Sequence, residues 1–335
     1  MLFSPFELKS VVFPNRIVMP AMCQYSAGED GVANEWHFVH YGSRAVGGVG
    51  CLILEATAVE PRGRISRQDL GLWDEAQVEP LRQLVDFCHR HGAVMGIQIA
   101  HGGRKACGPD LVAPSPLAAG PDYGVPQELS PAEIGDIVRR WGRAAKRAAA
   151  AGFDLLQVHG AHGYLIHEFL SPLSNHRTDE YGGGLEGRMR FLLEVVEEVK
   201  ANWPQDRVLS VRLSAVDYFA GGLTIGDTVQ IAAALKDAGV DLVDVSSGGL
   251  LPAPIDARPG YQVPFAEAVR KEVGIPTIAV GLISTAELAE EILANGRADF
   301  VALGRELLRN PYWPLQAMSN QREKWPFQYR RAAKD

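Results

Sequence analysis

The chain has 335 residues, with 33 Lys and Arg against 40 Asp and Glu, so its formal net charge is −7. This balance, with 47% hydrophobic and 22% charged residues, is ordinary for a globular protein and offers nucleic acid or anionic membrane little to bind. No stretch reaches the ~18 apolar residues that span a bilayer, and the N-terminus lacks a signal-peptide pattern. Its four Cys have no C-x-x-C spacing. We therefore expect a cytoplasmic protein with free thiols.

Short β-branched runs alternate with longer amphipathic stretches along the first half of the chain, as in βα units. Helices are predicted at 35–46, 75–91 and 130–151, the last opened by Ser130 as cap and Pro131 as first helical residue. Strands are predicted, in order, at residues 16–22, 51–59, 94–100 and 155–160.

The second half continues the alternation without a linker or a shift in composition. The predicted strands are almost wholly apolar, as parallel strands covered on both faces are. Eight strand–helix units predict an α/β protein with one closed (β/α)8 barrel over residues 1–335 and a short C-terminal extension. These later strands are expected at 208–214, 242–247, 277–281 and 300–304, and the helices at 187–202, 226–238, 265–273 and 285–295.

Polar residues interrupt the strands near their carboxyl ends, where barrel enzymes place their sites. Arg212, inside VLSVRLS, needs an anionic or electron-rich partner, which a ligand or a structural salt bridge could supply. Gln98, inside VMGIQIA, is either a satisfied core amide or faces a polar ligand ring. Around this rim we expect, in strand order, Cys23, Ala56, Gln98, His159 with His162, Arg212, Ser247, Gly281, and Gly304 with Arg305.

The last two predicted strands end in Gly281 and Gly304. There backbone N–H groups can approach a phosphate, and Arg305 can add a charge-assisted contact. The alternative is that both glycines form tight turns and Arg305 is a surface cation. Another glycine pattern, at residues 182–187, matches the dinucleotide fingerprint G-x-G-x-x-G but follows no apolar strand, so we reject it.

His159 and His162 are three residues apart and allow three interpretations. On one face of a helical turn they could hold a metal, or they could donate two hydrogen bonds to one substrate oxygen; otherwise they are unrelated loop residues. A metal needs a third ligand, and Glu55 is the candidate by type, although only one of Glu55 and Ala56 can face the barrel interior. A metal-dependent hydrolase and a non-catalytic binding barrel remain alternatives.

Several segments together carry a family resemblance that covers essentially the whole chain in order. They resemble the Old Yellow Enzyme family of flavin-dependent ene-reductases, in particular the bacterial subgroup with a cysteine beside the flavin, which includes NADPH dehydrogenases and xenobiotic reductases. The segments are HGAHGYLIHEFLSPLSNHRTDEYGG (159–183), RIVMPAMCQYS (16–26), EATAVEPRGRIS (55–66), GIQIAHGGRKA (96–106) and ALGRELLRNP (302–311).

The resemblance implies a barrel that binds FMN noncovalently, takes a hydride from NADPH or NADH, and reduces an activated C=C bond. The hydride would go to the β carbon of an α,β-unsaturated carbonyl, maleimide or nitro compound, and the α carbon would be protonated. No metal is implied. The flavin ring would lie against Pro20, Ala21, Met22, Cys23, Ala56, Gln98 and Arg212, and the phosphate against Gly281, Gly304 and Arg305.

The same resemblance assigns roles to individual side chains. Arg212 would stabilise the negative charge of the reduced flavin, and Cys23 would tune its potential as a weak donor. His159 and His162 would donate hydrogen bonds to the substrate oxygen. Tyr164 would give the proton to the α carbon, and Tyr25 would contact the substrate.

Three features concern departures and assembly. The family form YGGS-x-E-N-R has Gly184 in place of the Ser, which removes a helix cap. The loop at 106–127 is short for a region that often shapes substrate access. In the subgroup that the chain resembles, a C-terminal arginine reaches the neighbouring subunit's active site, and Arg331 matches it. The resemblance therefore implies a homodimer or a dimer of dimers. Dienoyl-CoA reductases are disfavoured, because the chain ends soon after the eighth strand and has no Cys cluster.

Overall fold

The computed structural model describes residues 1–318 and 321–333, and its central element is a closed barrel of eight parallel strands. The predicted (β/α)8 architecture is therefore confirmed. Three strands stop two or three residues before their predicted ends, the first of them at Pro20, which has no N–H for the ladder. The barrel strands are β3 (Ile17–Met19), β4 (Cys51–Ala58), β5 (Val94–Ala100), β8 (Leu155–Gly160), β9 (Val208–Ser214), β10 (Leu242–Ser246), β11 (Thr277–Ala279) and β12 (Phe300–Ala302).

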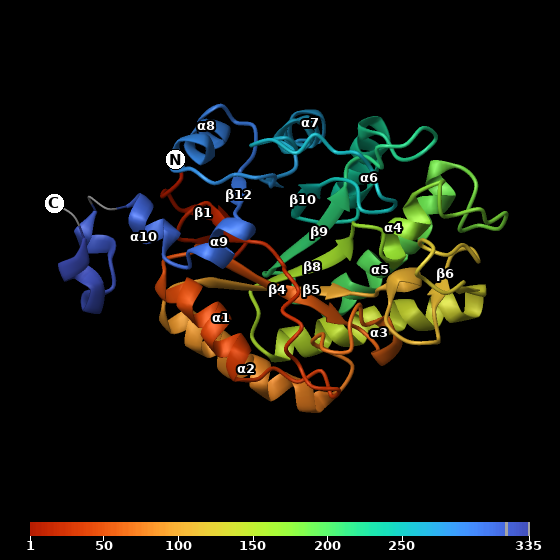
Figure 1. Ribbon diagram of the computed structural model, residues 1–335, viewed down its shortest axis with the longest axis horizontal. Coiled ribbons are helices and arrows are strands. Elements are labelled where there is room, and N and C mark those ends of the chain that lie inside the picture. The colour runs from red at the N-terminus through yellow and green to blue at the C-terminus, as the bar shows by residue number, and fades with distance from the viewer. Residues whose placement is uncertain (319–320, 334–335) are drawn as a thin grey trace.

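Helices surround the barrel, one after each strand (Figure 1). Side-chain caps fix the start of several: Asn34, Ser130 and Thr224 each accept a hydrogen bond from the first turn of their helix. The helix predicted at 187–202 begins two residues earlier, after Gly184, which makes no side-chain cap. The surrounding helices are α1 (Glu35–Val46), α2 (Val78–Arg90), α3 (Pro131–Ala150), α5 (Leu185–Asn202), α6 (Ile225–Asp237), α7 (Val263–Val273), α8 (Ala286–Ala294) and α9 (Arg305–Arg309).

A β-hairpin plugs the amino end of the barrel. Its strands, β1 (Phe6–Leu8) and β2 (Val11–Phe13), are too short to show a period of two in the sequence, so this element was not predicted. Phe13 meets Phe300 edge to face, with ring centroids 4.8 Å apart. The first residues of the barrel strands complete this apolar layer, which leaves only the carboxyl end of the barrel for polar chemistry.

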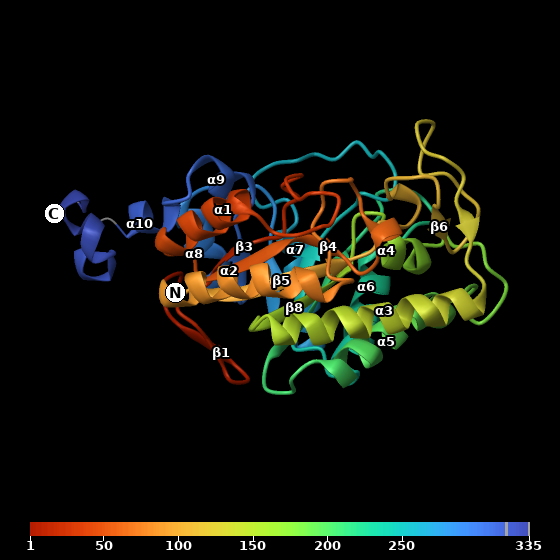
Figure 2. The same ribbon diagram turned by 90° about the horizontal axis from the view of Figure 1, so that it is seen from below.

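Smaller elements lie in the loops and beyond the last strand. β6 (Val112–Ala113) and β7 (Gln127–Glu128) pair within and beside the 106–127 loop, α4 (Leu165–Leu170) follows β8, and 3₁₀ turns η1, η2 and η3 cover Pro61–Gly63, Glu75–Gln77 and Gly103–Lys105. α10 (Trp313–Ala317) and 3₁₀ turns η4 (Arg322–Lys324) and η5 (Phe327–Ala332) project from the barrel in both views (Figures 1 and 2). Among the described helices, none is long and apolar enough to cross a membrane.

Candidate active site

A chain of four buried polar side chains crosses the barrel interior near its carboxyl end. Gln98 on β5 stands in register with Gln157 on β8, and Arg212 on β9 with Asp244 on β10. Gln98 Nε2 donates to Gln157 Oε1 at 2.7 Å, and Gln157 Nε2 donates to Asp244 Oδ2 at 3.3 Å. The side-chain nitrogen of the predicted residue Gln98 is thus satisfied by Gln157. Gln157 and Asp244, which the sequence analysis did not single out, link Gln98 to Arg212.

Arg212 has the structural ion-pair partner that the sequence left open. Its Nε lies 3.2 Å from Asp244 Oδ2, but the N–H is not aimed at that oxygen, so Nε makes no hydrogen bond. Asp244 is fully buried, and burial raises the pKa of its carboxyl although Arg212 and Gln157 act in the opposite direction. The signal that revealed Arg212, a lone charge in an apolar strand, also applies to Asp244 in LVDVSS.

A cavity of about 470 Å³ opens at the ends of β11 and β12. It brings together His162, Arg212, Gly281, Gly304 and Arg305, five residues predicted separately. Gly281 has φ = +129°, and a Cβ there would lie 3.1 Å from the backbone nitrogen of Gln262, so only glycine fits this wall without strain. Lining residues that were not predicted for the site include Ser246, Tyr261, Gln262, Ser284 and Arg309.

The segment after β3 lies beside the same cavity. A Cβ added to Gly304 would be 3.5 Å from Met22 Sδ and 3.7 Å from Pro20 Cγ. Ala21 and Cys23, the other predicted residues of this segment, are half-buried. Burial, assisted by the charges of Asp69 and Glu55, raises the pKa of Cys23 to about 12, so this thiol is protonated at neutral pH.

Glu55 does not have the position that a third metal ligand would need. The pairing of β4 with β5 shifts between Leu54 and Ala56, so Glu55 sits at a bulge while Ala56 pairs with Gln98. Glu55 Oε2 accepts a hydrogen bond from the Gln24 backbone at 2.6 Å. Within residues 1–318 and 321–333, no group of three or more His, Cys, Asp and Glu side chains is arranged to hold a metal ion.

The two predicted histidines lie together, but not on a helical turn. His159 is the penultimate residue of β8, opposite Arg212 in the register, and His162 sits in the following turn with φ = +62°. Their ring centroids are 5.3 Å apart, and the ring of Tyr164 is 5.1 Å from that of His159. Burial, and then the charge of Arg212, lowers the pKa of both imidazoles well below the ordinary value, so both rings are neutral.

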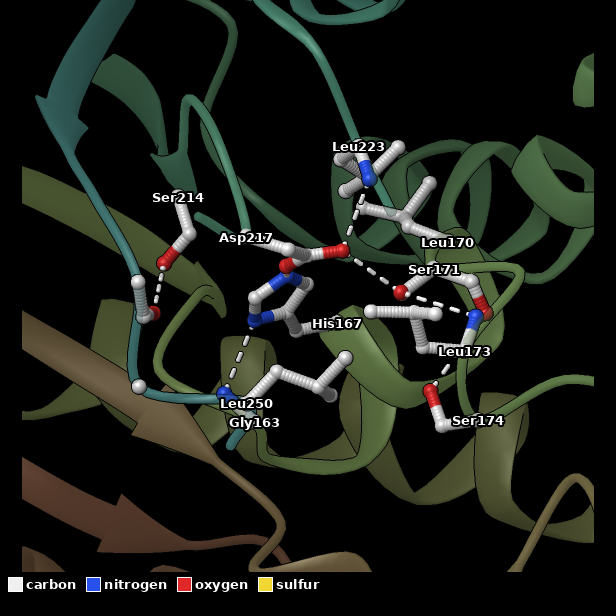
Figure 3. A network of polar contacts seen from close by, with 12 residues as sticks. Gly163, His167, Leu170, Ser171, Leu173, Ser174, Ser214, Asp217, Leu223 and Leu250 are labelled. Carbon is white, nitrogen blue, oxygen red and sulfur yellow. Dashed lines mark hydrogen bonds and ion pairs between the residues drawn. The ribbon is translucent and has the colours of Figure 1, made fainter. Parts of the chain in front are cut away.

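A buried hydrogen-bond network supports the turn that carries His162 (Figure 3). The Gly163 N–H donates to His167 Nδ1 at 2.8 Å, so the ring proton of His167 is on Nε2, which donates to Asp217 Oδ1 at 2.9 Å. Ser171 Oγ donates to the second oxygen of Asp217 at 2.6 Å. Lys105 adds a contact from η3, where its Nζ donates to the His162 carbonyl at 3.1 Å. These supporting residues were not predicted, because nothing in HEFLSP marks a buried histidine.

Two other predicted residues, Tyr25 and Arg331, are not among the residues that line the cavity. Tyr25 has φ = +54° and is 56% exposed. Arg331 is exposed on η5, in the part of the chain that projects from the barrel.

The fold and this cavity define the chain as a barrel protein with a cationic cavity for a phosphorylated cofactor, beside a pair of neutral imidazoles. A family model described as "NADH:flavin oxidoreductase / NADH oxidase family" matches residues 1–324. An NADPH dehydrogenase of Geobacillus thermodenitrificans is 53% identical over 318 residues, which cover 94% of this chain and 93% of that protein.

Solved structures agree with the sequence comparison. Morphinone reductase superimposes with a TM-score of 0.85 at 30% identity, over 95% of this chain and 89% of that one. An Old Yellow Enzyme homologue from Zymomonas mobilis gives 0.83 at 30% identity, over 95% and 92%. The chain belongs to the Old Yellow Enzyme family of NADH:flavin oxidoreductases. It is an FMN-dependent enzyme that uses NADPH or NADH as hydride donor.

The residues present fit FMN. Arg305 and Arg309 line the cavity together with Glu306, which pairs with Arg309 at 2.6 Å, so Arg305 supplies the cation that the anionic phosphate requires. Beside the lining residue His162, His159 Nδ1 is a buried polar atom without a hydrogen-bond partner in the described structure. Such orphaned groups are rare in proteins and are expected where a ligand completes the site.

Proposed function

We propose that this enzyme reduces the activated C=C bond of α,β-unsaturated carbonyl, maleimide or nitro compounds. The observation that carries the proposal is the pair of neutral imidazoles, His159 and His162, next to Arg212 at the inner end of the cofactor cavity. When bound, FMN supplies hydride chemistry to the substrate β carbon. The side chains of this barrel bind the substrate, orient it and deliver the proton.

The proposed cofactor contacts follow the cavity from its outer end inward. Gly281, Gly304 and Arg305 hold the phosphate, because they line the cavity beside the ends of the last two strands. For the flavin ring we propose residues of the segment after β3 and of β4, β5 and β9: Pro20, Ala21, Met22, Cys23, Ala56, Gln98 and Arg212.

His159 and His162 donate hydrogen bonds to the substrate oxygen on which negative charge develops. Ser246 Oγ lies 2.7 Å from His162 Nε2 and 3.3 Å from Gln262 Oε1, which already accepts from Ser247 Oγ at 2.6 Å. For His162 to donate to the substrate through Nδ1, the Ser246 hydroxyl donates to His162 Nε2 and not to Gln262. A neutral donor keeps its proton during the reaction, and losing one preorganised donor of this kind typically costs 10²- to 10³-fold in rate.

Tyr164 gives the proton to the α carbon. Its ring packs edge to face against His159, and burial raises the pKa of its phenol, so the phenol carries its proton at neutral pH. Tyr25 contacts the substrate from the rim. The protonated thiol of Cys23 acts as a weak donor toward the ring and not as a nucleophile.

The whole chain, residues 1–335, acts as one FMN-binding barrel domain in a homodimer or a dimer of dimers. Arg331 projects away from its own barrel on η5, which suits a contact with the active site of a neighbouring subunit.

The test is a comparison of the two half-reactions in a His162→Ala variant, with His89→Ala as control. His89 is a surface histidine whose side chain is 36% exposed and pairs with Asp154. We expect His162→Ala to slow anaerobic reduction of 2-cyclohexenone about 10²-fold or more and to change reduction by NADPH much less. Equal slowing of both half-reactions would contradict the donor role.

A further inference from the structure

Asp244 is a buried carboxylate that the proposed reaction does not use. Its exposure is 0%, and its Oδ1 has no hydrogen-bond partner in the described structure. Its Oδ2 has only Gln157 Nε2 at 3.3 Å and the ion pair with Arg212 at 3.2 Å. A buried charge with so few partners costs several kcal/mol of desolvation, which makes its presence beside the cofactor cavity informative.

The neighbours of Asp244 show where its charge acts. It faces the barrel interior beside Arg212, with which it stands in register on the adjacent strand. Arg212 lines the cavity, and within residues 1–318 and 321–333 its buried Nε has no hydrogen-bond partner. Arg212 thus has Asp244 on one side and the cofactor cavity on the other.

We propose that Asp244 is a positioning residue that sets the reduction potential of the bound flavin by offsetting the charge of Arg212. This inference rests on the proposed contact of Arg212 with the flavin ring. A cation beside the ring favours the reduced, negatively charged cofactor and raises the potential. A carboxylate 3.2 Å behind that cation opposes the effect, because the two charges partly cancel at the ring.

The partial cancellation of the Arg212 charge by Asp244 is useful because the flavin must first accept a hydride from NADPH and then give it to the alkene. Arg212 alone would make the flavin easy to reduce by NADPH but a poor hydride donor to an alkene. Asp244 restores driving force to the second half-reaction. Through Gln157 it is also linked to Gln98, so the orientation of two ring-lining residues is coupled to one carboxylate.

The experiment measures the two-electron potential of the FMN-loaded enzyme against a reference dye. Asp244→Asn keeps the shape and removes the charge, and Asp244→Ser is a second neutral variant if the first folds poorly. Asp244→Glu keeps the charge. Ser210→Ala is the matched control, because Ser210 lies two residues before Arg212 on β9, is fully buried, and its hydroxyl has no hydrogen-bond partner among the described residues.

Both neutral variants should raise the potential by about 30 mV or more, which corresponds to a tenfold change in the two-electron equilibrium. They should also speed reduction by NADPH and slow alkene reduction. Asp244→Glu and Ser210→Ala should stay close to the parent enzyme.

One more substitution, Arg212→Gln, separates the offset by Asp244 from the contact of Arg212 with the flavin ring. If it lowers the potential while the neutral Asp244 variants leave the potential unchanged or lower it, Asp244 only supports the fold and the offset is wrong. If Arg212→Gln also leaves the potential unchanged, Arg212 does not contact the ring, and both this inference and that part of the proposed function fail.

Discussion

Replacing His167 with leucine removes two hydrogen bonds that support the turn of His162, one from the Gly163 N–H and one to Asp217 Oδ1 (Figure 3). The Gly163 N–H and Asp217 Oδ1 then remain buried without those partners. Each unsatisfied group costs about 1–3 kcal/mol, so we expect a loss of about 2–6 kcal/mol in the free energy of unfolding. With an unfolding entropy of roughly 2.1 cal/mol/K per residue, this lowers the Tm by roughly 3–9 °C for a chain of 335 residues.

Thermal unfolding of the FMN-loaded protein is the assay, and His89→Leu is the matched control. His89 also pairs with an aspartate, Asp154, but at the surface, where such a pair is worth about 1 kcal/mol or less. In the folded His167→Leu variant, binding of 4-hydroxybenzaldehyde, followed by its effect on the flavin spectrum, should weaken because the turn of His162 keeps its bonds to Ser214 and Lys105 but loses its support from His167. A Tm loss no larger than that of His89→Leu would refute the structural reasoning, and unchanged phenol affinity would refute the link to the site.

Three further outcomes follow from the site. Burial holds the pKa of His159 well below its ordinary value near 6.5, so below pH 6.5 the imidazole takes up a proton when the protein unfolds. The free energy of unfolding therefore decreases as the pH is lowered, by up to about 1.4 kcal/mol per pH unit. His159→Asn should make this fall shallower in urea titrations between pH 6.5 and 5; an identical slope would disprove it. Gly281→Ala should weaken FMN binding, measured by fluorescence. Gly108→Ala, also at positive φ but with open space for a Cβ, should not weaken it. Equal effects would argue against the requirement for glycine at position 281. With a pKa of about 12, Cys23 should react with iodoacetamide at pH 8 about 10²- to 10³-fold more slowly than an unperturbed thiol, by peptide mass spectrometry; rapid labelling would show a thiolate there.

The barrel was predictable because its signals are local. Apolar runs such as CLILEATA and the cap at Ser130 place elements without knowledge of the fold. The hairpin of β1 and β2 was not predictable, because three-residue strands have no measurable period and Phe13 is ordered only by its contact with Phe300.

The site was predictable where one unusual residue stands in a regular strand. Arg212 and Gln98 are of this kind, and Gly281 and Gly304 mark strand ends. The partners of these residues come from other strands and loops, so they appear only once the barrel has closed.

The helical turn considered for the two histidines illustrates the limit. His162 adopts φ = +62° because Gly163 and His167 hold the turn, and no spacing rule contains that contact. The bulge at Glu55 is a second case, because a register shift against β5 cannot be read from the β4 sequence alone.

Anaerobic mixing of the NADPH-reduced enzyme with 2-cyclohexenone tests the central claim most directly. The account predicts that the oxidised flavin spectrum returns without oxygen and that one equivalent of cyclohexanone forms per FMN. A flavin that stays reduced with 2-cyclohexenone, N-methylmaleimide and a nitroalkene, and reoxidises only when oxygen is admitted, would contradict the proposed alkene reduction.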